Sequence, residues 1–381
     1  MTGEREALVA LNLAGDLGPV TIARLVSHFG SAANVLGAGE GDLRQCPGVG
    51  AAKAASIHSA LASADPAREF EKARRLGVTM LVSCDPGYPA LLRKIHDPPV
   101  VLYCFGDLKA FGVPSVAMVG TRLPSLYGSE TARRFAYAIA NAGYCVTSGM
   151  ARGIDTESHR GALDAGGRTI GVLGGAIDCF YPAENRELGR RAAKSGGLVV
   201  SEFPFGRKPD RGTFPMRNRI VSGLSRITLV VEAAAKSGSL ITAGQAAEQG
   251  RTVMAIPGRI DSPTSVGCNI LIRDGAAMAI SPDDILDELH SLDVAMPGPP
   301  AGHADGRAAK PSPAPPPKPF VPLSSEEQSL LDAIGSGEVQ IDEVIRISGV
   351  EAGRANALLL ALRLKRLAEL LPGGWVRRKK G

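Results

Sequence analysis

Short apolar runs alternate with longer amphipathic stretches through the middle of the chain. Strands of a buried sheet are indicated at residues 115–119, 144–147, 169–173, 198–201, 227–231 and 252–256. Helical periodicity between them predicts helices at 129–142, 154–165, 183–194, 216–223 and 239–249, with a last one near 282–289. Strands that alternate with helices in this way predict an α/β fold with a doubly wound, mostly parallel sheet.

Two further strand-like runs precede this region, at residues 78–82 and 100–106, after a connector helix at 66–76. They flank the turn Asp97-Pro98-Pro99, which cannot be helical. We therefore expect the two runs to extend one edge of the main sheet.

Short helices separated by glycine-containing turns are predicted for residues 1–65. The turn at residues 47–50, Pro-Gly-Val-Gly, is typical of the hairpin in a helix-hairpin-helix unit, where glycines let backbone amides approach a DNA phosphate. Lys53 is the strong cation close to this turn, so a DNA contact and a purely structural hairpin are both open.

Composition changes sharply after residue 295, because residues 296–322 contain ten prolines. Such a segment indicates a linker. Beyond it, helices at 324–334, 341–347 and 351–370 and a hairpin at Trp375 predict a winged-helix module. Its third helix could enter a DNA groove or the module could dock a protein; the cations of that helix are Arg354, Arg363, Lys365 and Arg366. The predicted domains are therefore 1–65, 66–292, 293–322 as the linker, and 323–381.

Charge and cysteine usage narrow the class of protein. The 381-residue chain has a net charge of +5, which is compatible with nucleic-acid binding. Its six cysteines form no C-x-x-C pair, so we expect free thiols in a reducing compartment. The first residues lack the pattern of a signal peptide and no run has the length of a membrane span. A soluble, cytoplasmic protein without membrane contact is expected.

The polar loop after the first central strand offers an anion site. Gly120, Thr121, Arg122 and Ser125 separate this strand from an alanine-rich helix. A strand, a polar loop and a helix N-terminus are the arrangement that gathers anions in open α/β sheets. Neither a G-x-G-x-x-G fingerprint nor a P-loop motif is present. In the alternative interpretation, Gly120 only turns the chain and Arg122 caps a helix or pairs with a carboxylate.

Loops at the ends of the other strands should meet at the same edge of the sheet. They contain small, hydroxyl-bearing and basic residues, among them Gly149, Arg152, Gly153, Ser237, Gly238, Ser239 and Thr242. Residues 207–219 carry five cations against one acid, Asp210, and include Phe214. Five aromatic residues lie nearby: Phe180, Tyr181, Phe203, Phe205 and Phe214. Cations and aromatics together favour a groove for single-stranded nucleic acid over a solvated basic loop with core aromatics.

Catalytic residues are harder to identify. Asp155 and His159 lie four residues apart on one predicted helix, where a capping aspartate and a core or surface histidine are favoured over a pair. No nucleophile with its base and no metal-ligand set emerges. We therefore expect no catalytic residue, no metal and no cofactor, and do not predict an enzyme.

Seven motifs in order give the chain a specific resemblance. They are AMVGTRLPSLYG, SGMARGID, GGAIDCFYPAEN, SEFPFG, FPMRNRIVSGLS, VVEAAAKSGSLITA and IPGRIDSPTSVGCNILIRDGA. This series resembles the DNA-processing protein A family, also called DprA or Smf. The resemblance implies an extended Rossmann-like domain flanked by an N-terminal all-α SAM-like domain and a C-terminal winged helix. It also implies a homodimer that binds single-stranded DNA during natural transformation, protects it and loads a RecA-type recombinase onto it.

The family's functional residues map onto this chain motif by motif. Arg122 would hold a phosphate, Arg211 would contact a phosphate and Phe214 would stack on a base. The same pocket would be lined by Arg217, Asn218 and Arg219 together with Gly149, Arg152, Ser237, Gly238 and Thr242. The resemblance places recombinase docking on no particular residue.

Two other classes of function remain open for such a sheet. A nucleotide or phosphoribosyl hydrolase is compatible with the glycine-rich loops, and release of base or phosphate from free nucleotides would indicate it. A winged-helix transcription regulator with a nucleotide-sensing central domain would instead bind one duplex sequence through residues 323–381.

Overall fold

The computed structural model describes residues 3–15, 17–295, 324–335, 337–351, 354–355, 358–359, 362, 367–371 and 375–378. The chain divides into two compact units, Met1–Gly302 and His303–Gly381. In the part of the chain that is described, no helix combines the length and the apolar character needed to cross a bilayer.

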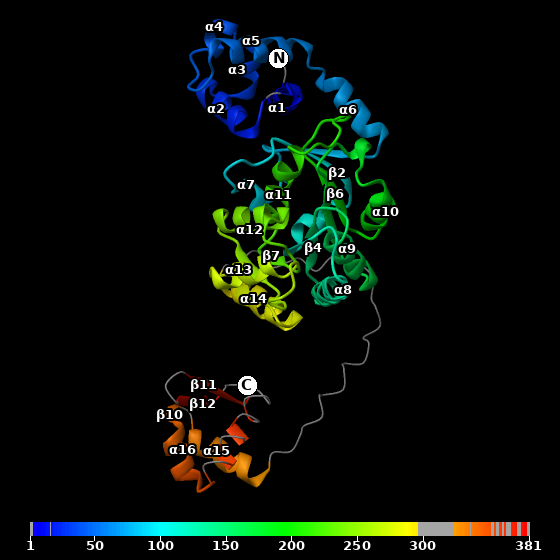
Figure 1. The fold of residues 1–381 in the computed structure, drawn as a ribbon. Coiled ribbons are helices and arrows are strands. Elements are labelled where there is room, and N and C mark those ends of the chain that lie inside the picture. The colour runs from blue at the N-terminus through cyan, green and yellow to red at the C-terminus, as the bar shows by residue number, and fades with distance from the viewer. Residues whose placement is uncertain are drawn as a thin grey trace, which may run out of the picture. The chain divides into compact units, whose positions relative to one another are not determined.

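Five helices form the N-terminal part of the first unit (Figure 1): α1 (Glu4–Leu13), α2 (Pro19–Phe29), α3 (Ala32–Gly37), α4 (Glu40–Leu43) and α5 (Ala51–Ser63). Their apolar faces share a core that includes Leu11, Leu25 and Leu43. The predicted glycine hairpin joins α4 to α5, and Gly48 adopts a φ of 80°, which favours glycine. Arg24 Nη1 donates to the carbonyl oxygen of Pro47 at 3.2 Å.

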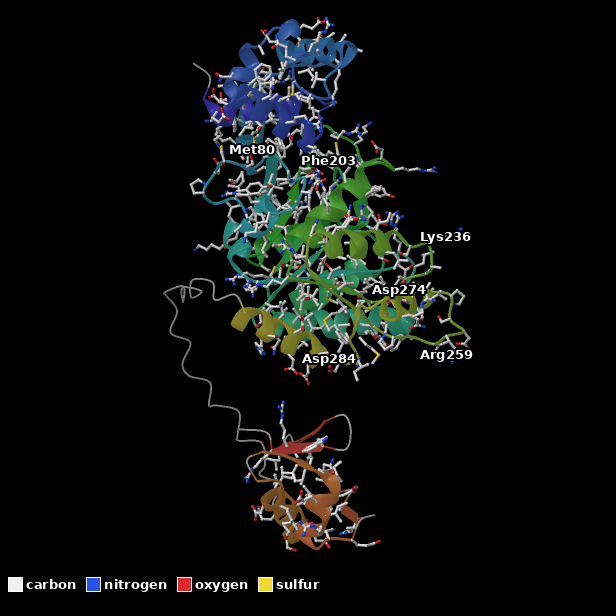
Figure 2. The ribbon with its side chains drawn as sticks, turned by 90° about the vertical axis from the view of Figure 1, so that its left-hand side faces the viewer. Met80, Phe203, Lys236, Arg259, Asp274 and Asp284 are labelled. Carbon is white, nitrogen blue, oxygen red and sulfur yellow. The ribbon has the colours of Figure 1, made fainter. Side chains whose placement is uncertain are left out.

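The predicted edge extension of the sheet is confirmed. After α6 (Pro66–Arg75), strands β1 (Thr79–Val82) and β2 (Val101–Gly106) pair antiparallel, and β2 pairs antiparallel with β6 (Leu198–Ser201). Met80 and Phe203 lie where the N-terminal helices meet the sheet (Figure 2). The connection between β1 and β2 contains a short helix, α7 (Ala90–Arg93), that was not predicted because four residues carry too little periodicity.

The main sheet has nine strands in the order β1-β2-β6-β5-β4-β3-β7-β8-β9. Its parallel strands are β3 (Ser115–Val119), β4 (Cys145–Ser148), β5 (Thr169–Val172), β6, β7 (Ile227–Val230), β8 (Thr252–Ala255) and β9 (Ala277–Met278). The chain winds from β3 through β4 and β5 to one side, then returns to place β7 on the other side of β3. Such a reversal of winding opens a crevice at the carboxyl ends of the two central strands.

Helices cover both faces of this sheet. On one face, α8 (Leu126–Asn141), α9 (Ile154–Asp164) and α14 (Pro282–Ala295) pack on side chains such as Met118 and Leu229. On the other face, α11 (Thr213–Gly223), α12 (Gly238–Glu248) and α13 (Val266–Arg273) pack on side chains such as Val119 and Val230. The remaining elements are α10 (Arg186–Lys194) and the 3-10 turns η1 (Leu108–Gly112), η2 (Ile177–Cys179) and η3 (Ala183–Asn185).

Most predicted helix boundaries differ from the structure by one to three residues. α8 begins at Leu126, earlier than predicted, because the Ser125 side chain caps it by accepting from the Gly128 amide. α11 begins at Thr213 instead of 216. This earlier start brings Phe214 onto the helix.

The second unit contains α15 (Ser325–Ile334), α16 (Ile341–Ser348) and a three-stranded sheet in the order β10-β12-β11 (Glu338–Gln340, Trp375–Arg378, Ala368–Leu371). The prediction of one helix over 351–370 is wrong at its end, since Ala368 begins β11. Arg354 donates to Glu326 at 3.0 Å, so this cation is paired within the unit. The predicted cations Arg363, Lys365 and Arg366, and the predicted linker 296–322, lie outside the described residues.

Candidate nucleic-acid interface

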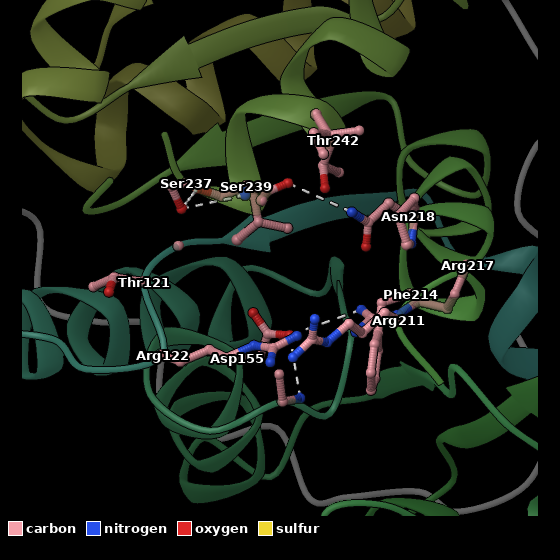
Figure 3. A pocket seen from close by; sticks show the side chains of 16 residues that line it. Thr121, Arg122, Asp155, Arg211, Phe214, Arg217, Asn218, Ser237, Ser239 and Thr242 are labelled. Atoms are coloured by element: carbon pink, nitrogen blue, oxygen red, sulfur yellow. Dashed lines mark hydrogen bonds and ion pairs between the residues drawn. The ribbon is translucent and has the colours of Figure 1, made fainter. Parts of the chain in front are cut away.

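A pocket of about 450 Å³ lies at the reversal of winding between β3 and β7 (Figure 3). The loop after β3, the loop after β4, the first turns of α11 and the start of α12 form its walls. It is lined by Val119, Gly120, Thr121, Arg122, Ala151, Asp155, Arg211, Phe214, Pro215, Arg217, Asn218, Ser237, Gly238, Ser239, Ile241 and Thr242. The carboxyl ends of the strands thus converge where the sequence predicts them to.

Two arginines, Arg122 and Arg211, give this pocket positive charge. Among the described residues, neither Arg122 nor Arg211 forms an ion pair with a carboxylate. The Arg122 guanidinium instead lies over the ring of Phe214, 5.0 Å from its centroid. A guanidinium on an aromatic face keeps its N–H donors at the ring edge free for a ligand.

The N-terminus of α12 forms another wall of the pocket. Ser237 caps this helix, and its hydroxyl oxygen accepts from the Ser239 amide at 3.3 Å. Asn218 Nδ2, from α11, lies 3.5 Å from the carbonyl oxygen of Gly238 and links the two helices. Amides at a helix N-terminus carry partial positive charge, so this wall favours an anion as well.

Arg217 and Asp155 form the buried floor of the pocket, with exposures of 5% and 6%. Arg217 Nη1 lies 3.8 Å from Asp155 Oδ2, and the same oxygen accepts from the amides of Gly149 and Ala151 at 3.1 and 3.2 Å. Burial raises the pKa of Asp155 against the opposing effect of Arg217, and burial lowers the pKa of Arg217. The carboxylate therefore holds both the loop after β4 and the guanidinium in place.

Most residues predicted from the sequence come together in this pocket. Those that line it are Gly120, Thr121, Arg122, Arg211, Phe214, Arg217, Asn218, Ser237, Gly238, Ser239 and Thr242. Gly149 and Arg152 line a smaller adjoining pocket that shares Arg122, Phe214 and Arg217 with the first. Arg152 is paired there with Glu184, so its charge is partly neutralised.

Ser125 and Gly153 do not line either pocket. The Ser125 amide donates to Glu232 Oε2 at 2.9 Å, so the protein's own carboxylate occupies the N-terminus of α8 where the sequence predicted an external anion. Gly153 adopts a φ of 77°, and a Cβ there would clash with the carbonyl oxygen of Thr121. Both residues shape the loops around the pocket.

Arg219 lies outside the pocket as well, which corrects the sequence-based placement beside Arg217. Its Nε donates to Asp97 at 2.8 Å and its Nη2 to Glu202 at 2.5 Å, and its side chain is 5% exposed. Residues two apart on a helix point about 200° away from each other. The side chains of Arg217 and Arg219 therefore lie on opposite sides of α11.

Only two of the five aromatic residues near the basic segment reach the pockets. Phe203 is buried, Phe205 packs on Tyr103 with ring centroids 5.1 Å apart, and Phe180 packs against a small core cluster. Phe214 and Tyr181 remain at the pockets. The predicted interleaving of cations and aromatics is therefore correct for these two and wrong for the other three.

Sequence reasoning missed several lining residues. Ile241 and Pro215 are apolar and gave no chemical signal, while Tyr181 was noted only as one aromatic among five. Asp155 was interpreted as a helix cap, and the glycine-rich turn before it was the signal that could have placed it. His159 is a fully buried core residue, and its Nδ1 lies 2.7 Å from Thr169 Oγ1. It does not pair with Asp155, in agreement with the favoured interpretation, which had left core and surface positions open.

Comparisons with known proteins cover all three parts of the chain. Residues 79–290 match the family model of DNA recombination-mediator protein A. Residues 310–374 match the DprA winged helix domain, and residues 15–63 match a SAM-like helix-hairpin-helix tandem. The chain is 35% identical to Protein Smf of Synechocystis sp. in an alignment of 379 positions that covers 94% of each chain.

Solved structures give the same result. DNA processing protein A of Streptococcus pneumoniae superposes with a TM-score of 0.65 at 34% identity, over 76% of this chain and 99% of that one. The Helicobacter pylori protein, solved for its single-stranded DNA binding mode, superposes with a TM-score of 0.51 at 30% identity, over 56% and 96% of the two chains. The resemblance read from seven sequence motifs is thereby confirmed, and this chain belongs to the DNA recombination-mediator protein A family, the DprA or Smf proteins.

Proposed function

We propose that this protein binds single-stranded DNA in the pocket between β3 and α12. The observation that carries the proposal is the pair of arginines without carboxylate partners among the described residues, Arg122 and Arg211, beside the Phe214 ring and the N-terminus of α12. The guanidiniums and amides would take phosphates, and the ring would take a base. The Helicobacter pylori relative, which is described by its single-stranded DNA binding mode, supports the same ligand.

The shape of the site supports a single strand over a duplex. The aromatic ring and the arginines share one pocket of about 450 Å³, so a base and its phosphate must enter together. Bases in a duplex are stacked and paired, whereas those of a single strand can turn toward an aromatic ring. Contacts to phosphates and to the face of a base carry no sequence information, so we expect little sequence preference.

The membership in a family of recombination mediators supports a place for this binding in recombination. In our proposal the protein acts in the cytoplasm during natural transformation, covers incoming single strands against nucleases and loads a RecA-type recombinase onto them. It does so as a homodimer and without catalytic turnover. Nuclease protection, recombinase-dependent strand exchange and the mass in solution test these steps one at a time.

The central test is fluorescence anisotropy with a labelled oligonucleotide, single- and double-stranded, over a series of salt concentrations. Arg122→Ala and Arg211→Ala should each weaken single-strand binding about tenfold or more, because each removes a charged hydrogen-bond donor to phosphate. Each should also reduce the slope of log K against log salt by about 0.7 for every phosphate that the variant no longer neutralises.

Arg160→Ala is a matched control, since Arg160 is half-exposed, pairs with Glu157 and lines neither pocket. It should bind as the parent does. The proposal is contradicted if duplex binds as tightly as single strands and if neither Arg122→Ala nor Arg211→Ala weakens binding. That result would favour a transcription regulator that binds duplex DNA through its winged helix. Release of base or phosphate from nucleotides would favour the hydrolase instead.

A further inference from the structure

A second aromatic side chain, Tyr181, lies next to the pocket and contacts the ring of Phe214. The ring centroids of Tyr181 and Phe214 are 6.1 Å apart, and their planes are inclined by 54°. A base held between two parallel rings needs about 7–8 Å, twice the optimal separation of carbon atoms. The two rings therefore contact each other in a tilted arrangement, and they must move apart by about 1–2 Å and become more nearly parallel before a base fits between them.

Rotation of the Tyr181 side chain would widen this gap and would also change its interaction with Arg152. The side chain is 44% exposed, so its rotation breaks no core packing. It belongs to the smaller pocket of about 20 Å³, which it shares with Arg122, Arg152 and Phe214. This pocket is too small for a base as it stands, and a rotation of the exposed ring is the movement that would enlarge it.

The backbone that carries Tyr181 is, in contrast, firmly attached to the floor of the main pocket. Asn185, four residues further on, is 4% exposed and donates through Nδ2 to the carbonyl oxygens of Met150 and Ala151 at 2.9 and 3.2 Å. Met150 holds a φ of 56°, which is unusual for a residue other than glycine and needs such support. Tyr181 is thus an exposed ring on a fixed support.

The charges around the two rings suit a nucleotide. Arg122 lies over Phe214 and has no carboxylate partner among the described residues, so it can reach a phosphate when a base takes its place on the ring. Arg152 stays paired with Glu184 and adds little net charge. An aromatic slot with an unpaired cation beside it fits a base with its own phosphate better than it fits an apolar ligand.

We propose that Tyr181 and Phe214 form a slot that holds one nucleobase of the bound single strand. This inference rests on the proposed function and adds the place of a base to it. The rings contact only the faces of the base, so the slot accepts all four bases. It fixes the strand in the pocket, because a stacked base has to leave the slot before the strand can slide.

The direct test uses fluorescence. The chain has one tryptophan, Trp375, in the second unit, so Trp375→Phe gives a silent background in which Tyr181→Trp supplies a single probe. Adding an oligothymidine should quench this tryptophan, with the same midpoint as the anisotropy titration. An oligonucleotide of equal length made of abasic sites should bind more weakly and leave the fluorescence unchanged.

The binding test uses Tyr181→Ala against parent and control. Loss of one stacked base should weaken oligothymidine binding about 5- to 150-fold. Tyr181→Phe should bind as the parent does, because it keeps the ring. Tyr137→Ala is the matched control: Tyr137 is similarly exposed, at 47%, lies on α8 and lines neither pocket.

The outcomes separate the slot from the proposed function. If Tyr181→Ala binds oligothymidine like the parent while Arg122→Ala is weakened, the function stands and the slot is overturned. Equal losses of Tyr181→Ala on oligothymidine and on the abasic strand also overturn the slot, because the ring then acts on the backbone. If the parent protein does not bind single strands at all, both the slot and the proposed function are overturned. Melting temperatures equal to the parent's show that the variants are folded.

Discussion

At the scale of single residues, Arg217 and Arg219 show how the same side chain serves two purposes on one helix. Arg217 lines the pocket, whereas Arg219 joins Asp97, before β2, to Glu202, after β6. Arg219→Ala would leave Glu202 buried without its partner. We expect the free energy of unfolding to fall by about 3–5 kcal/mol, as for other broken buried pairs. Urea unfolding followed by circular dichroism measures this loss.

The same variant also tests the placement of Arg219 outside the pocket. Single-strand affinity per folded molecule should equal that of the parent at low temperature, where both are folded. Adding Glu202→Gln should restore part of the stability, because it removes the unpartnered charge. A variant that keeps its stability and loses DNA affinity would show that Arg219 contacts the strand after all.

The buried His159 side chain should make the stability of the protein depend on pH. Thr169 Oγ1 donates to the carbonyl oxygen of Val146 at 2.7 Å, so it must accept from His159 Nδ1. The unprotonated Nε2 is buried and has no hydrogen-bond partner among the residues that the structure describes. Burial and the charge of Arg217 lower the pKa of His159 to about 3. The unfolded chain has the ordinary value near 6.5, so it binds the extra proton first as pH falls. Stability contributed by the neutral ring is complete above pH 6.5 and is lost between pH 6.5 and about 3.

Urea unfolding at several pH values measures this effect. Below pH 6.5, His159 alone should lower the parent's free energy of unfolding by about 1.4 kcal/mol for each pH unit. His159→Gln should remove this contribution from the slope of unfolding free energy against pH. His58→Gln is the control, because His58 is exposed on α5. If the parent and His159→Gln have identical slopes between pH 6.5 and 4.5, the histidine is not held neutral by the fold.

At the scale of elements, close approach of the loop after β4 to α11 fixes the pocket floor. A Cβ on Gly149 would overlap Arg217 Nη1, so Gly149→Ala must displace the guanidinium from Asp155. We expect a loss of about 1–3 kcal/mol in stability from overpacking, together with weaker single-strand binding. Thermal unfolding and anisotropy measure the two effects on the same sample.

Gly244→Ala is the matched control for this substitution. Gly244 lies on α12, and a Cβ there would have no neighbour within 4 Å. Alanine in a helix interior should then stabilise the protein by about 0.5–1 kcal/mol and leave DNA binding unchanged. Parent-like binding by Gly149→Ala would mean that the position of Arg217 does not matter for the strand.

The elements also show how far the sequence could predict this site. Apolar runs and strand-helix alternation predicted which loops meet, so most pocket residues followed from their place after a strand. Arg217 and Arg219 both fall within the predicted helix 216–223, so their opposite directions follow from the helical period. Which of the two faces the pocket could not be predicted, because the Arg219 partners Asp97 and Glu202 come from distant segments. The anion at α8 could not be predicted either, because Glu232 comes from a loop 107 residues later. Pairwise contacts between distant segments leave no periodic signal.

At the scale of the whole molecule, the composition of residues 293–322 predicts where the chain can be cut. The domain limits at 65, 292 and 322 remain predictions, and trypsin tests them. First cleavage should fall after Arg307, because Lys310 and Lys318 are each followed by a proline and resist trypsin, and the larger product should keep single-strand binding. A first cut within 207–219 would instead show that the basic segment is the most accessible part, and bound DNA should then slow it.

The position of the pocket at the reversal of winding has a consequence for the history of such proteins. The opening between β3 and β7 arises from the order of strands, so it exists whichever side chains line it. Substitutions in the surrounding loops can exchange one ligand for another without rebuilding the core. A few substitutions in these loops can therefore change which ligand the pocket binds. Proteins that share this fold need not bind the same ligand.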